Sequence, residues 1–218
     1  MMGSSISRNS IMLGLFAIMT TALIAGTYLG TRDMIVEAQR KAQEKALLEI
    51  IPGERHDNSM LDDTLIIGPE ADGLRLSSSQ QIFIARQQEK AVAVILPVTA
   101  PDGYSGAIDL IVGINSDGSI AGVRVLTHKE TPGLGDKVDL NKSDWILSFN
   151  GTSLRNPMPA QWKVKKDKGY FDQFTGATIT PRAVTAAIKR SLEYFQANQQ
   201  SLLAPLQTTP IGEENSDG

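Results

Sequence analysis

Cysteine is absent from this sequence of 218 residues, and only two histidines, His56 and His128, are present. The lack of cysteine excludes disulfides, thiolate metal sites and an iron–sulfur cluster held by this chain. Two histidines far apart in the sequence favour surface or hydrogen-bonding roles, because a metal site usually needs more ligands. The formal net charge of −3 shows no basic excess. Nucleic acid is therefore discounted as a partner, because binding it needs clustered lysine and arginine.

The remaining composition is that of a folded protein of ordinary character. Hydrophobic residues make up 41% and charged residues 21% of the chain, which predicts a normal core. The length indicates one domain with appendages.

One long uncharged segment lies near the N-terminus. After an N-terminal tail at 1–10, residues 11–29 read IMLGLFAIMTTALIAGTYL. At 1.5 Å per residue a helix over 11–30 nearly spans a hydrocarbon core of about 30 Å. The alternative is a cleaved signal peptide, whose apolar region is typically about 7–15 residues and ends at a small-x-small site. The length of the run favours a retained transmembrane helix.

Charge leaves the orientation of this helix open. Arg8 precedes the run, whereas Arg32, Arg40, Lys41 and Lys45 follow it. This bias favours a cytoplasmic domain, although long domains are often translocated regardless of charge.

Ala22, Gly26 and Gly30 recur every four residues and share one face of the predicted helix. Small residues at this spacing allow another transmembrane helix to approach closely. Ordinary use of glycine and alanine in an anchor is the alternative.

The chain after the anchor divides into three parts. A charged helical stem is predicted over 31–51, with Glu37–Lys41 and Arg40–Glu44 at the spacing that supports an exposed helix, and Pro52-Gly53 ends it. A folded domain follows over 52–203, with its core at 91–196. The acidic, polar segment 204–218 is predicted to be disordered.

The domain combines strands with a terminal helix, which indicates an α+β fold. Strands are predicted over 91–98, 107–114 and 120–126, the last two forming a hairpin around Asp117-Gly118. Residues 52–80 are predicted to be mostly loop. In the C-terminal helix, Thr180 is the expected N-cap and Pro181 the first helical residue. Its expected apolar face consists of Val184, Ala187, Ile188, Leu192 and Phe195.

Two motifs in this domain suggest chemistry. In DQFTGATIT, residues 172–180, small residues surround Thr178 and the chain runs directly into a helix. The free N–H groups and positive dipole end of a helix start suit a phosphate, although a plain glycine turn would read the same way. In HKETPGLGD, residues 128–136, Pro132-Gly133 suits a type II turn. Gly133 and Gly135 would let a flat ring lie close to the backbone.

The first motif resembles the flavinylation motif of the FMN-binding domain family. The second resembles the ETPGLG loop of the same family, and Trp145 and Phe149 in DWILSF continue the likeness. The match covers about 103–195. Together with the single anchor, it resembles the G subunits of Rnf-type ion-translocating electron transport complexes. The related C subunits of sodium-translocating NADH:quinone reductases, which usually read SGAT and are longer, are the alternative. A membrane-tethered binding module that is never modified is a second alternative.

The resemblance implies an electron carrier with covalent FMN and no catalytic acid or base. In the family, a flavin transferase moves FMN from FAD onto the last threonine of the motif through a phosphoester, and here that threonine is Thr178. Thr175, Gly176 and Ala177 would shape its approach, with Thr180 capping the helix. Asp172 would matter to the transferase. The residues implied to border the isoalloxazine are Thr131, Gly133, Leu134 and Gly135.

The resemblance also implies partners and a location. The partners would be the membrane, the flavin transferase and the other membrane and redox subunits of the complex. The anchor would sit in the bacterial inner membrane with the soluble domain in the periplasm, which overrules the weak charge bias.

Overall fold

The computed structural model describes residues 2–205, with side chains from residue 8 onward. The chain forms two compact units, Met1–Lys45 and Ala46–Gly218. The tail predicted over 204–218 falls almost entirely outside the described residues.

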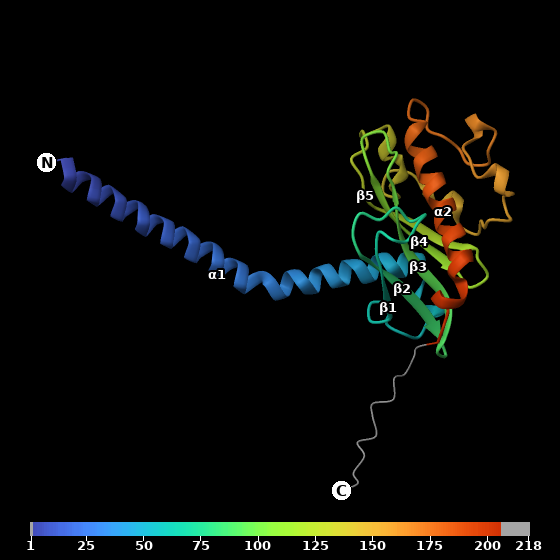
Figure 1. The fold of residues 1–218 in the computed structure, drawn as a ribbon, viewed down its shortest axis with the longest axis horizontal. Helices are drawn as coiled ribbons and strands as arrows, with labels where there is room; N and C mark the ends of the chain where they lie inside the picture. Colours follow the sequence, from blue (N-terminus) through green and yellow to red (C-terminus); the bar gives the residue numbers. More distant parts are fainter. Residues whose placement is uncertain (1, 206–218) are drawn as a thin grey trace, which may run out of the picture. The chain divides into compact units, whose positions relative to one another are not determined.

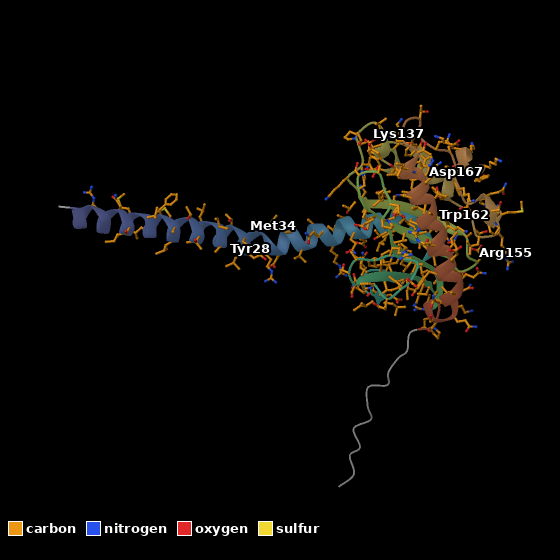
Figure 2. The ribbon with its side chains drawn as sticks, turned by 45° about the horizontal axis from the view of Figure 1, so that its top comes forward. Tyr28, Met34, Lys137, Arg155, Trp162 and Asp167 are labelled. Carbon is orange, nitrogen blue, oxygen red and sulfur yellow. The ribbon has the colours of Figure 1, made fainter. Side chains whose placement is uncertain are left out.

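The first unit is one helix. Helix α1 runs from Met2 to Ile50 without a break, and its last turn belongs to the second unit. The part from Arg8 onward contains a stretch long and apolar enough to cross a membrane, judged by length and composition. The large apolar side chains between residues 11 and 36 are exposed, among them Tyr28 and Met34 (Figure 2). The expected pair of Lys41 Nζ with Glu37 Oε1 forms at 2.7 Å.

The second unit is built on an antiparallel sheet with strand order β1-β2-β3-β4-β5 (Figure 1). The strands are β1 (Thr64–Ile67), β2 (Gln80–Gln87), β3 (Lys90–Ala100), β4 (Ile108–Asn115) and β5 (Ile120–Thr127). The three predicted strands and the hairpin at Asp117-Gly118 are confirmed. The expectation of a loop over 52–80 is wrong at Thr64–Ile67, which forms an edge strand. Strand β2 is not predicted, because its apolar centre is short and is flanked by polar residues and by Arg86, so it lacks the apolar pattern of a strand.

The two faces of the sheet are covered by different elements. On one face, Val94, Leu96 and Val98 of β3 pack with the apolar side of α2 (Ile179–Leu202). All five residues of the predicted helix face are buried there: Val184, Ala187, Ile188, Leu192 and Phe195. On the other face, Ala93 and Ile95 pack with Leu47, Ile50 and Ile51. A strand buried on both faces explains why 91–98 reads as a continuous apolar run.

The end of the stem is therefore core, which corrects the expectation of an exposed stem. Ile50 lies over Gly113 and Gly122, and a Cβ added to Gly113 would overlap its side chain. Arg124 also fixes this turn, because its Nη2 donates to the carbonyl oxygen of Glu49 at 3.2 Å. A cation at the last carbonyls of a helix is a stabilising cap.

Short 3₁₀ helices lie between β5 and α2. The HKETPGLGD motif runs into the first of them, and the DQFTGATIT motif follows the last of them and runs into the start of α2. These helices are η2 (Gly135–Val138), η3 (Asp144–Phe149), η4 (Pro159–Gln161) and η5 (Lys165–Asp167), while η1 (Gly53–Arg55) follows α1. The outcome is the predicted α+β fold, with one apolar N-terminal helix ahead of it.

Candidate functional site

The turn after β5 forms as expected. Leu134 N–H donates to the Thr131 carbonyl oxygen at 3.1 Å, and Gly133 has a φ of 78°. A positive φ at the third position is what a type II turn requires, and glycine adopts it without strain. The turn places Leu134 and Gly135 one after the other facing the start of α2.

The start of α2 differs from the prediction. Thr178, and not Thr180, occupies the N-cap position, and its side chain makes no capping hydrogen bond. Pro181 is the third helical residue and not the first. The helix begins at Ile179, two residues earlier than expected, and the Thr180 hydroxyl does not cap it because it is engaged elsewhere. It donates to the Glu130 carboxylate, fifty residues away in sequence.

Glu130 joins three segments around this helix start. The residue is only 5% exposed. Oε2 accepts from Thr180 on α2, and Oε1 accepts from the Ser105 N–H of the loop before β4 at 2.9 Å. The Glu130 N–H in turn donates to His128 Nδ1 at 3.1 Å. A buried carboxylate is tolerated only when its oxygens are hydrogen-bonded, and here the bonds hold the walls of one site together.

Gly135 completes this contact by lacking a side chain. A Cβ at Gly135 would lie 2.5 Å from Glu130 Oε2 and 2.8 Å from Thr180 Oγ1. Any larger residue would therefore separate Glu130 from Thr180. The second glycine of the ETPGLG motif is thus explained by close packing of its loop on α2.

The two motifs line one pocket of about 340 Å³. Seven of the nine predicted site residues contribute to it: Thr131, Leu134, Gly135, Gly176, Ala177, Thr178 and Thr180. The predicted residues Thr175 and Gly133 are exposed and lie outside the lining. Tyr104, Glu130 and Ile179 were not predicted. Glu130 belongs to the HKETPGLGD motif, and Tyr104 directly follows the turn at Gly103. The sequence around each of them could therefore have indicated a place in the site.

The rim of the pocket is apolar and open to solvent. Tyr104 is 69%, Leu134 43% and Ile179 46% exposed. Large apolar side chains left exposed together often mark a binding site. A larger cavity of about 730 Å³, between β1 and the last turns of α2, contains no residue of either motif.

Aromatic side chains support the segment that leads into the pocket. Trp145 packs edge-on against Phe149 and Phe174, with ring centroids 5.2 and 5.1 Å apart. Its Nε1 donates to the Asp172 carbonyl oxygen at 2.8 Å. The Asp172 carboxylate itself points to solvent and pairs with Lys165 Nζ at 2.7 Å.

An ion pair fixes the other side of the helix start. Arg182 donates from Nε and Nη2 to the two carboxylate oxygens of Asp167, each at 2.6 Å. This double hydrogen bond lowers the pKa of Asp167 below its ordinary value of 3.8. Asp167 and Lys137 lie on the segments around the first turns of α2 (Figure 2).

Comparison with known proteins identifies the family. The family model of the FMN-binding domain matches residues 103–193, and that of the RnfG N-terminal region matches residues 1–50. The G subunit of the ion-translocating oxidoreductase complex of Pseudomonas aeruginosa is 50% identical over 202 residues, which cover 92% of this chain and 94% of the relative. The chain belongs to this family of G subunits. The G subunit of Shewanella loihica is 48% identical, and the match covers 93% of this chain and 95% of the relative.

Membership of this family confirms the sequence-based assignment over the quinone reductase alternative. The match to the FMN-binding domain spans both motifs and every residue of the pocket, so it supports FMN as the cofactor. Among solved structures, the C subunit of the Na(+)-translocating NADH-quinone reductase from Parabacteroides distasonis is similar. It has a TM-score of 0.44 and 18% identity, and the match covers 65% of this chain and 77% of that one.

Proposed function

We infer that this chain is a membrane-anchored electron-carrier subunit of an ion-translocating oxidoreductase complex, and we propose that its FMN is joined covalently to Thr178. The observation that carries the proposal is the convergence of the TGAT and ETPGLG segments on one pocket beside the Thr178 side chain. The other subunits of such a complex are then its working partners, which agrees with the names of its relatives.

The pocket suits a flavin mononucleotide. Its volume of about 340 Å³ falls in the range of small-molecule sites. The backbone at Gly176 leaves room for a flat ring, whereas the space beside Gly135 is filled by Glu130 and Thr180. Leu134 and Ile179 offer apolar contact. The openness of this rim is useful to an electron carrier, because part of the ring would stay accessible to partner proteins.

Thr178 is well placed to carry the phosphate. Its hydroxyl is not used for capping, so a bond to phosphorus would cost no existing capping hydrogen bond. The N–H groups of Ile179 and Thr180 lie in the first helical turn and have no acceptor within the helix. Together with the helix dipole they would hold an anion at this position.

Attachment is a transfer and not a redox step. The Thr178 oxygen would lose its proton and bond to the flavin-side phosphorus of FAD, and AMP would leave with the electrons of the broken P–O bond. A flavin transferase is the proposed partner for this step. The exposed carboxylate of Asp172, six residues before Thr178, is accessible to such an enzyme.

Once bound, FMN supplies reversible uptake and release of electrons. The chain's own contribution is binding and orientation. Glu130 and Thr180 fix the pocket wall to the helix that bears Thr178, which holds the ring in one place relative to its surroundings.

The membrane placement follows from α1, whose apolar stretch is long enough to span a bilayer. We propose that the membrane is the bacterial inner membrane and that the domain faces the periplasm. A reversibly bound cofactor is lost when its free concentration falls below Kd. A phosphoester would make occupancy independent of free FMN in a compartment open to dilution.

The experiment that tests the function uses membranes containing the assembled complex. The flavin on this chain should be reduced when electrons are supplied to the complex and reoxidised when an acceptor is added. A complex carrying Thr178→Ser, which keeps a hydroxyl, should retain more of this cycling than one carrying Thr178→Ala. A flavin that stays in one redox state during turnover of the complex would refute the electron-carrier role.

A further inference from the structure

A segment beside the flavin site carries an unusual concentration of positive charge. Four lysines, Lys163, Lys165, Lys166 and Lys168, lie within residues 163–168, and all four side chains are exposed. We call residues 159–172, which contain them, the lysine arm. Like charges so close together repel one another, and folding alone gives no reason to gather them.

The lysine arm is held rigidly by its buried residues. Phe171 stacks on Phe149 with ring centroids 4.2 Å apart, and Val164 is fully buried. The Lys165 N–H donates to the Phe171 carbonyl oxygen at 2.7 Å, and the Gly169 N–H donates to the Val164 carbonyl oxygen at 3.0 Å. The lysines are thus displayed on a fixed loop, and their charges keep a defined arrangement.

The arm is also fastened to the helix that carries the proposed flavin. Asp167 is bound by Arg182, whose backbone N–H donates to the Thr178 carbonyl oxygen at 3.3 Å. The Lys166 N–H donates to Gln173 Oε1 at 3.0 Å, just before the TGAT segment. The arm is therefore attached to the chain both before and after Thr178, at Gln173 and at Arg182.

Within the part of the chain that the structure describes, three of the four lysines in the arm form no ion pair, so their ammonium groups can interact with a partner. Lys165 pairs with Asp172, and Asp167 pairs with Arg182, with Lys163 and Lys166 also close enough to interact with the Asp167 charge. Across the described residues, no ion pair engages the ammonium groups of Lys163, Lys166 or Lys168. Tyr170, at 53% exposure, adds an aromatic side chain to the same loop. Exposed aromatic residues are enriched at protein interfaces, whose rims are polar.

We propose that the lysine arm is the docking surface for an acidic face of another protein subunit, which exchanges electrons with the flavin beside it. The proposal rests on the proposed function, because an electron carrier must bring its partner close to the cofactor. Complementary charge speeds such encounters and fixes their orientation without requiring a large interface. Protein is favoured over lipid because the partly exposed carboxylates of Asp167 and Asp172 lie in the same surface and would oppose an anionic bilayer.

The test is zero-length cross-linking in membranes that contain the assembled complex. A carbodiimide joins lysine amines to carboxylates only where they touch. The expected result is cross-linked peptides that join Lys163, Lys166 or Lys168 to aspartate or glutamate of another subunit. In Lys163→Glu together with Lys166→Glu, Lys168 keeps its amine, and the yield of its cross-link alone should fall about tenfold, as expected when steering charges are reversed. The control Arg75→Glu with Lys90→Glu reverses the same charge on exposed residues outside the arm and should leave the yield unchanged.

Two outcomes would overturn the docking proposal. One is cross-linking of the arm lysines only within this chain while the subunits remain assembled. The other is protection of these lysines from acetylation when the full chain is reconstituted alone in vesicles containing phosphatidylglycerol but not in pure phosphatidylcholine, which would assign the arm to lipid. Intact mass of the same samples reports the flavin separately. A chain lacking FMN would count against the proposed function, and cross-linking would still report on the arm.

Discussion

Replacing Glu130 by alanine should destabilise the domain through loss of the contacts around the helix start. The Thr180 hydroxyl, fully buried, would lose the carboxylate that accepts its hydrogen bond, at a cost of about 1–3 kcal/mol. The Ser105 N–H belongs to an exposed residue and can be rehydrated, so its loss adds about 1 kcal/mol. The alanine variant no longer buries a carboxylate, and the desolvation free energy saved offsets part of the loss of these two hydrogen bonds. The expected total is about 2 kcal/mol, which lowers Tm by roughly 4–8 °C in a domain of this size.

The assay is thermal unfolding of the full chain in detergent, followed by tryptophan fluorescence. Glu130→Gln keeps the shape and one acceptor oxygen, so it should cost less than Glu130→Ala. Thr180→Val removes the other partner, and the double variant should be less destabilised than the sum of the singles by about 1 kcal/mol, because both changes remove one interaction. If Glu130→Ala unfolds at the same temperature as the wild type, or the two changes add independently, Glu130 does not join the pocket walls as described.

Three further expectations concern other parts of the molecule. A reporter active only outside the cytoplasm, fused after Leu203, should be active, and a well-expressed inactive fusion would favour the orientation suggested by charge. Gly26→Leu should leave membrane insertion intact but reduce recovery of the other subunits, compared with Leu23→Ala on a different face; equal recovery from both would make the small-residue face incidental. The pKa of Asp167 is lowered by its bond to Arg182. The stabilisation from this pair should be present above about pH 4 and lost as pH falls further, and Asp167→Asn should abolish that acid-dependent part of Tm.

The elements that the sequence predicted are those with a strong local pattern. The apolar run 91–98, the Asp117-Gly118 hairpin and the helix face ending at Phe195 each follow from spacing within a few residues. Strand β2 was missed because its apolar and polar residues do not alternate regularly. Arg86 is buried, and its Nε forms an ion pair with Asp63 Oδ2 at 2.7 Å. That partner lies far enough along the chain that no local pattern reveals it.

The errors at the site have the same origin. Thr180 followed by Pro181 has the sequence pattern of a helix start. The Thr180 hydroxyl instead donates a hydrogen bond to Glu130, and the helix begins earlier, at Ile179. The last turn of the stem, at Leu47 and Ile50, looked solvated because its partners on the sheet lie far along the chain. Local sequence can place a motif on an element, but long-range polar and apolar partners decide which of its side chains are free.

The attachment of FMN to Thr178 is tested most directly by intact mass and peptide mapping of the full chain, expressed with a flavin transferase. The mass should exceed that of the chain by one FMN minus water, and the modified peptide should contain Thr178. Denatured wild-type protein and Thr175→Ala should both fluoresce on a gel, whereas Thr178→Ala should be dark and unmodified. A Thr178→Ala band that still fluoresces, or a wild-type chain of unmodified mass despite an active transferase, would contradict the central claim.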